Sequence, residues 1–121
     1  MANSHRGEVS FECEGQNYIL SFTTNALCEL EDALNLGIAE ISEILSDPKR
    51  LRMKYVRAVI WAGLTDKHPQ ITIKEAGLIV GVIGLQKAID LMSRGFSLAF
   101  PDGGEGQKNP PKGRAGTGRA S

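Results

Sequence analysis

The sequence of 121 residues has few of the side chains that build catalytic or metal sites. It contains two histidines, His5 and His68, and neither has a cysteine or carboxylate nearby at the spacing of metal ligands. The two cysteines, Cys13 and Cys28, lack CxxC spacing, so we expect both to be reduced thiols of a cytoplasmic protein. We therefore expect a protein that is not an enzyme and that needs no cofactor and no metal.

A phosphate-binding loop is also missing. Gly77, Gly81 and Gly84 form a GxxxGxxG pattern, but no Lys-Ser/Thr pair follows it and no predicted strand precedes it. The pattern therefore matches neither a P-loop nor a dinucleotide-binding motif. We expect instead that these small residues let a helix approach its neighbour closely.

Long hydrophobic runs are absent as well. The longest uncharged apolar stretch, residues 76–85, has ten residues, which is about half of what a membrane span requires. The N-terminus runs directly into polar sequence without the apolar core of a signal peptide. These features predict no membrane partner and a location in the cytoplasm.

The net charge is zero, but the charges are unevenly spread. Residues 1–47 carry one base and nine acids, whereas residues 48–57 carry five bases and no acid. This basic segment could contact nucleic-acid phosphates, yet no recognition motif accompanies it and the pI of about 6.7 is far from the basic range of DNA-binding domains. Nucleic acid is thus disfavoured as a partner. Lys49, Arg50 and Arg52 are candidates for attracting an acidic partner protein.

Hydrophobic periodicity predicts an α+β fold that is mainly α. Apolar and polar residues alternate over residues 8–14, a turn with a glycine covers 14–17, and a second strand covers 18–23, which together make a β-hairpin. Apolar residues three and four apart then predict about five short helices that pack on the hairpin. Their approximate ranges are 24–36, 38–46, 48–62, 73–83 and 85–96.

Two helix starts have specific signals. Asp47-Pro48 suits an N-cap followed by proline at the first helical position, and the sequence from Thr72 to Glu75 forms a capping box. Residues 101–121, by contrast, hold six glycines and three prolines, with two alanines as their hydrophobic residues. Such a composition cannot bury enough apolar surface to fold. We therefore predict one globular domain over residues 1–100 and a disordered Gly/Pro/Lys-rich tail over 101–121.

Several segments resemble the small tail proteins of gene transfer agents, which are labelled tail tube proteins or tail assembly chaperones. The resemblance covers residues 6–101. The segments that carry it are RGEV at 6–9, LSFTTNALCELE at 20–31, VIWAGL at 59–64, HP at 68–69, TIKEAG at 72–77 and AFP at 99–101.

The resemblance implies a protein of a long-tailed phage, a prophage or a gene transfer agent. It implies a tail assembly chaperone, which binds the tape measure protein in the bacterial host cytoplasm before tube subunits polymerise around it. The implied partners are the tape measure or other tail proteins, and further copies of the chain. Relatives are made in short and frameshift-extended forms, which would make residues 101–121 a linker or end segment. No catalytic residue is carried over.

Such a chaperone would cover the apolar stripe of a helical partner with an apolar groove. The row Leu85, Ile89, Met92 and Phe96 has helical spacing and could supply that groove, although the same row could instead pack on the hairpin. The candidate partner-binding residues are therefore Lys49, Arg50, Arg52, Leu85, Ile89, Met92 and Phe96.

Two other functions remain open. A structural tail subunit, such as a tube or completion protein, would stay in the virion tail. A tube subunit needs several long strands to close a ring, and the sequence predicts two short ones. A DNA-binding regulator would use the third helix and its basic residues.

Overall fold

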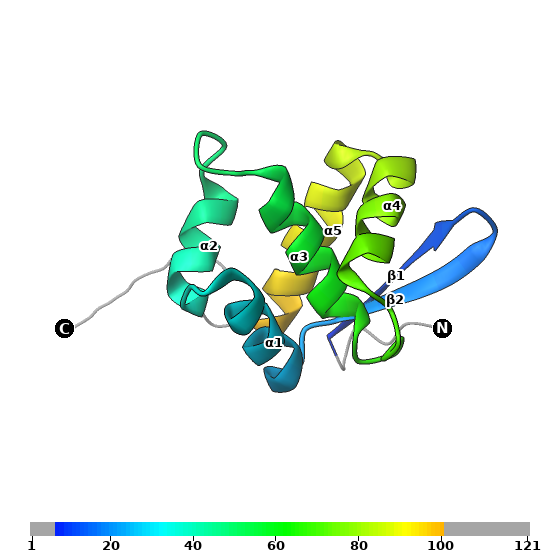
Figure 1. Cartoon of the computed structure of the whole chain (residues 1–121), viewed down its shortest axis with the longest axis horizontal. Helices are drawn as coiled ribbons and strands as arrows, with labels where there is room; N and C mark the ends of the chain where they lie inside the picture. Colours follow the sequence, from blue (N-terminus) through cyan, green and yellow to red (C-terminus); the bar gives the residue numbers. More distant parts are fainter. Residues whose placement is uncertain (1–6, 101–121) are drawn as a thin grey trace.

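The computed structural model describes residues 7–100, which form an antiparallel hairpin followed by five helices (Figure 1). This architecture confirms the predicted α+β, mainly α fold. The predicted disordered segment 101–121 lies outside the described residues, so the division of the chain at residue 100 stays a prediction. The elements are β1 (Glu8–Cys13), β2 (Gln16–Ser21), α1 (Thr24–Leu34), α2 (Ile38–Ser46), α3 (Met53–Leu64), α4 (Ile73–Ile83) and α5 (Leu85–Ala99).

The hairpin follows the predicted alternation, with a tighter turn. Val9, Phe11 and Cys13 are buried on one face of β1. Cys13 pairs with Gln16, so the turn holds two residues, Glu14-Gly15, and β2 begins before the predicted residue 18. Both turn residues have positive φ, at 53° and 79°, as in the type I′ turn whose twist matches that of paired strands.

Glu8 is an exception to the alternation. The pattern places it on the polar face, but its side chain is only 8% exposed. Its carboxylate lies 3.3 Å from Nζ of Lys67, in the loop after α3. A charge is tolerated at this depth because a countercharge accompanies it.

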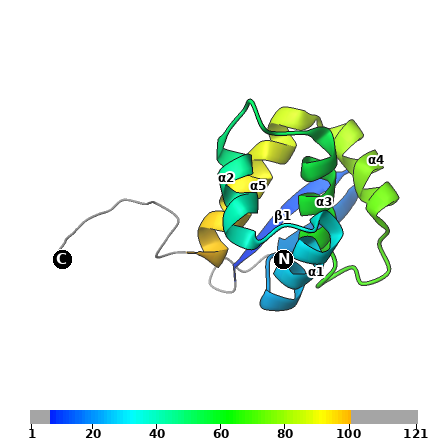
Figure 2. The same ribbon diagram turned by 60° about the vertical axis from the view of Figure 1, so that its left-hand side comes forward.

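The core is built around α3. This helix packs against α1, α4, α5 and β2, and seven of its twelve residues are buried. The hairpin contributes Leu20, which is fully buried, and β1 packs against α4 and α5. Figure 1 shows α2 at the opposite end of the molecule from the hairpin turn, and Figure 2 shows it beside α5.

Two glycines make room for one aromatic ring at the centre of this core. An added Cβ on Gly63 of α3 would lie 2.8 Å from the Phe22 ring, and one on Gly95 of α5 would lie 2.5 Å from it. Phe22 follows β2 and is 6% exposed. The close helix approach predicted for Gly77, Gly81 and Gly84 is seen at Gly77, which packs closely on the side chain of Arg57 in α3. It is wrong for Gly81 and Gly84, which face open space.

The prediction that α3 begins at Pro48 is wrong. The helix begins at Met53, and Asp47 instead closes a single turn by accepting a hydrogen bond from the N–H of Lys49 through Oδ1. Extended backbone at Arg52, with φ −125° and ψ 151°, separates this turn from α3. Between Pro48 and Arg52 the only core contact is Leu51, so no apolar stripe exists to stabilise an earlier helical start. The end was also placed too early, because Gly63 is inside α3.

The junction of α4 and α5 is a sharp corner. The Thr72 capping box begins α4 as predicted, and Gly84, with φ of +94°, separates the two helices. Among the described residues no single helix is long and apolar enough to cross a membrane. Taken together, α4 and α5 have the length and apolar composition of a broken membrane span, with a bend of 115° between the two helices.

Candidate partner-binding groove

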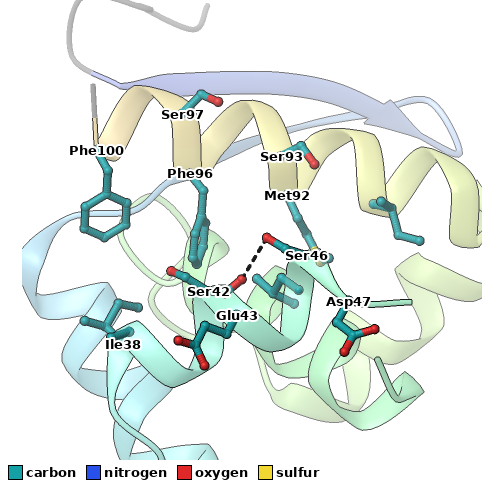
Figure 3. A pocket seen from close by; sticks show the side chains of 13 residues that line it. Ile38, Ser42, Glu43, Ser46, Asp47, Met92, Ser93, Phe96, Ser97 and Phe100 are labelled. Atoms are coloured by element: carbon teal, nitrogen blue, oxygen red, sulfur yellow. Dashed lines mark hydrogen bonds between the residues drawn. The ribbon is translucent and has the colours of Figure 1, made fainter. Parts of the chain in front are cut away.

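An apolar groove of about 820 Å³ lies between α2 and α5 (Figure 3). Its apolar lining comes from both helices and from the residue after α5: Ile38 and Leu45 on one wall, and Ile89, Met92, Phe96 and Phe100 on the other. Ser42, Ser46, Ser93 and Ser97 add hydroxyls along the same walls. Figure 3 shows Phe96 and Phe100 pointing from the α5 side toward α2.

The α5 wall continues into the core through edge-to-face contacts between aromatic rings. Phe96 meets Phe22 edge-on at 4.9 Å between ring centroids, and it meets Phe100 at 5.7 Å on its other side. Met92 is nearly buried, whereas Ile89 and Phe96 are half-buried. The α5 wall is therefore anchored in the centre of the domain, and its apolar side chains form the floor of the groove.

The α2 wall is attached at fewer points. Ile41 and Ile44 hold it to the domain by their buried side chains. Its first turn has no side-chain cap from Gly37, but Oε2 of Glu31 in α1 accepts a hydrogen bond of 2.8 Å from the N–H of Ile38. Glu31 therefore positions the start of α2, and with it one end of the groove.

The predicted apolar row divides at this site. Ile89, Met92 and Phe96 line the groove together, while Leu85 lies outside the groove lining and is 43% exposed beside the α4–α5 corner. The two uses considered for the row are compatible, because Phe96 contacts Phe22 on its inner side and faces the groove on its outer side.

The groove lining carries negative charge only. Glu43 and Asp47 lie on the α2 side, and none of the lining residues is basic. Arg50 approaches Glu43 at 3.9 Å, but both side chains are largely exposed, so this pair contributes little stability. A partner with basic residues beside its apolar contact surface would therefore match the groove.

The three basic candidates do not form a binding surface on one helix. Lys49 and Arg50 lie in the turn after α2, and Arg52 is the N-cap of α3; all three are exposed. None of them lines the groove. They were expected to share one helix beginning at Pro48, but α3 begins five residues later, at Met53. The structure therefore does not bring them together with the apolar row.

A second hollow, of about 540 Å³, lies between the hairpin turn and α4 and contains Cys13 and His68. Burial, with a smaller effect of Glu14, raises the pKa of Cys13, and burial lowers the pKa of His68. Nε2 of His68 accepts a hydrogen bond of 3.3 Å from the N–H of Ile19, which requires the unprotonated nitrogen. Burial thus disfavours the thiolate of Cys13, which is the reactive form of a cysteine. Within residues 7–100 no group of three or more acidic, histidine or cysteine side chains could hold a metal ion.

Sequence reasoning missed the α2 wall. Its signal is one broad apolar stripe on a short helix, since Ile41 and Ile44 are buried while Ile38 and Leu45, at one edge of the same stripe, are half-buried and line the groove. It also missed the exposed face of α4, where Leu78 and Val82 are 67% and 53% exposed. The uncharged run 76–85 was a usable signal, because a helix without polar residues must expose apolar ones.

Comparison with known proteins identifies one match. A family model described as "Phage tail tube protein, GTA-gp10" matches residues 6–100. No curated protein matches significantly, and neither does any solved structure.

Proposed function

This chain belongs to the phage tail tube protein family of the GTA-gp10 type, and from that membership and the groove we propose that it is a tail assembly chaperone that binds the tape measure protein. A role in the tail of a phage or gene transfer agent follows from the family itself. The chaperone activity, the tape measure as partner and the bacterial cytoplasm as the place of action are the proposal. No catalytic step is part of it.

The observation that carries the proposal is the groove between α2 and α5. A tape measure protein is long and helical, so it exposes apolar stripes that would aggregate without a cover. The groove presents seven apolar side chains from α2, α5 and Phe100, which is the form of site that accepts the apolar face of a third helix. Many copies on one long partner would bind more firmly than a single site alone.

The alternative is a structural subunit that stays in the tail, which fits the description of the family. The described residues hold a single sheet of two six-residue strands. A ring of sheet would require longer strands or pairing with neighbouring copies, since an isolated hairpin has little stability of its own. This architecture favours the chaperone over a tube wall.

Co-expression with the tape measure gene of the same phage or gene transfer agent tests the proposal. We expect the tape measure protein to move from the insoluble to the soluble fraction when this chain is present, and to co-purify with it. A tape measure whose solubility does not respond to this chain would contradict the chaperone function.

The content of purified particles distinguishes a chaperone from a structural subunit. A chaperone is expected to be depleted from mature tails relative to the infected or producing cell. Stoichiometric amounts of this chain in the particle, measured by quantitative mass spectrometry, would favour the structural subunit.

A further inference from the structure

We propose that the α2–α5 groove binds one amphipathic helical segment of the partner, about two to three turns long, whose apolar stripe is flanked by lysine or arginine. The inference rests on the proposed function in that the tape measure is the expected source of the segment. It goes further by assigning the surface and the chemistry that this surface selects.

The walls of the groove require a helical occupant. Both walls are helices whose backbone groups are bonded within the helix, and no strand edge borders the groove. An extended peptide would thus find no strand edge to pair with and would depend on the serine hydroxyls of the walls for its backbone hydrogen bonds, whereas a helix satisfies its own. The nine residues of α2 span about 13 Å, which corresponds to about two and a half turns of a bound helix.

The lining indicates the side chains of that helix. The apolar floor suits a stripe of residues spaced three and four apart. The lining charges, Glu43 and Asp47, are both negative and lie on the α2 side, so they favour cations flanking the stripe, which would compete with the exposed Arg50 for Glu43. The half-buried Ile89, Phe96 and Phe100 offer most of the apolar contact surface on the α5 side, because Met92 is only 3% exposed.

Two other occupants suit the groove less well. Residues 101–121 carry a net +2, but their hydrophobic residues are two alanines, which cannot fill a floor of isoleucine, methionine and phenylalanine. A second copy would offer its exposed α4 face, where Lys74 and Glu75 cancel each other and provide no matching charge. The charge of the lining therefore favours a basic helix from a different chain.

The test uses the full chain and two labelled synthetic peptides in fluorescence anisotropy titrations. Each peptide is an amphipathic helix of 18 residues with the same leucine stripe, flanked by lysines in one and by glutamates in the other. We expect the lysine peptide to bind about tenfold more tightly than the glutamate peptide at low salt, and this preference to shrink as salt screens the exposed charges.

Matched variants assign the binding to the groove. Ala39→Trp places a bulky side chain at an exposed lining position, the second residue of α2, and should weaken both peptides about tenfold or more. Asn25→Trp, at the exposed second residue of α1 and outside the groove lining, is the control and should leave binding unchanged.

The charges are tested with Glu43→Gln combined with Asp47→Asn, which retains the Oδ1 acceptor for the N–H of Lys49. This variant should bind the two peptides with affinities that differ by less than about threefold. The exposed helical acid Glu29 lies outside the groove lining, so Glu29→Gln should keep the full preference. Circular dichroism confirms that each variant is folded.

Several results would overturn the inference. Equal affinity for both peptides would remove the charge selection, and binding that Ala39→Trp leaves intact would place the site elsewhere. A concentration-dependent dimer that Ala39→Trp abolishes would assign the groove to a second copy. NMR signals of residues 101–121 that shift in Ala39→Trp without peptide would assign it to the chain's own C-terminal segment.

The outcome is separable from that of the chaperone function. If the tape measure becomes soluble with this chain and equally with Ala39→Trp, the function stands and the groove assignment fails. If the groove selects the lysine peptide while the tape measure does not respond to the chain, the groove assignment stands and the partner is a different protein.

Discussion

Phe22 connects the hairpin, the central helix and the groove. Its ring lies between Gly63 and Gly95, where no Cβ would fit without movement, and it contacts the Phe96 ring that lines the groove. The position was predictable from alternation along the second strand, because Phe22 shares a face with Tyr18 and Leu20. The two glycines were not, since their close approach depends on helices that are far apart in the sequence.

Gly95→Ala tests this packing. The added Cβ would lie 2.5 Å from Cε2 of Phe22, so we expect the free energy of unfolding to fall by about 1–3 kcal/mol from overpacking, even though alanine favours helices. Gly81→Ala is the control, because that glycine faces open space within α4 and the change should raise stability by up to about 1 kcal/mol. Equal urea denaturation curves for the two variants would contradict the tight fit around Phe22.

His68 predicts a pH dependence of stability. Burial lowers its pKa below the ordinary 6.5 of the unfolded chain, so the unfolded state binds the proton more readily. The stabilising contribution is therefore complete above pH 6.5 and is lost as the pH falls through the lowered pKa of the folded state. Urea midpoints of wild type and His68→Gln at pH 7.5 and 5.5 measure it. The wild type should lose more stability between these values, and parallel losses would show that His68 is not responsible.

At the scale of elements, the hairpin turn contains a correctable strain. Glu14 has φ of +53°, a conformation that residues with a side chain other than Asn or Asp seldom adopt. Asn-Gly is the preferred sequence of a type I′ turn, so Glu14→Asn should raise the free energy of unfolding by about 0.5–1 kcal/mol. Thermal unfolding checks it, with the exposed Glu12→Asn in the middle of β1 as a control that should not stabilise.

The attachment of α2 provides a second prediction at this scale. Glu31→Ala removes the acceptor for the N–H of Ile38. Because losing a helix cap typically costs about 1 kcal/mol, we expect the stability of α2 to fall by about that amount. Amide hydrogen exchange in residues 38–46 should accelerate about fivefold, while exchange in α3 should stay unchanged. The neighbouring exposed Asp32→Ala is the control. Uniform acceleration through the domain would show that Glu31 stabilises the whole fold instead of α2.

The elements differ in how far local sequence determined them. The hairpin and α4 were predicted well, because alternation and the Thr72 capping box act over a few residues. The start of α3 was not predicted correctly. Asp47-Pro48 satisfies the local signal for the start of a helix, but Leu51 is the only core contact between residues 48 and 52, so a helix beginning there would lack packing. The groove depends on α2 meeting α5 across some fifty residues of chain, and no local pattern encodes that pairing.

At the scale of the whole molecule, the charge distribution predicts weak DNA binding. The basic segment 48–57 is split between a turn and the first half of α3, and the chain is neutral overall. We expect affinity for duplex DNA no better than nonspecific, with a dissociation constant of about 10⁻⁴ M or weaker at physiological salt. Anisotropy titrations of the wild type and of Lys49/Arg50/Arg52→Ala at two salt concentrations check it. A strong, salt-dependent affinity that the triple variant loses would favour the DNA-binding regulator.

Phe100 has a consequence for any sequence joined to the domain. It follows α5, lines the groove and contacts Phe96 there, so the described part of the chain ends beside the groove. A segment attached at that point is tethered beside whatever the groove holds, and its effective concentration toward that ligand is set by tether length, reaching millimolar values for short flexible linkers. A longer product that continues past Phe100 could therefore contact the same partner twice, with modest affinity at each contact.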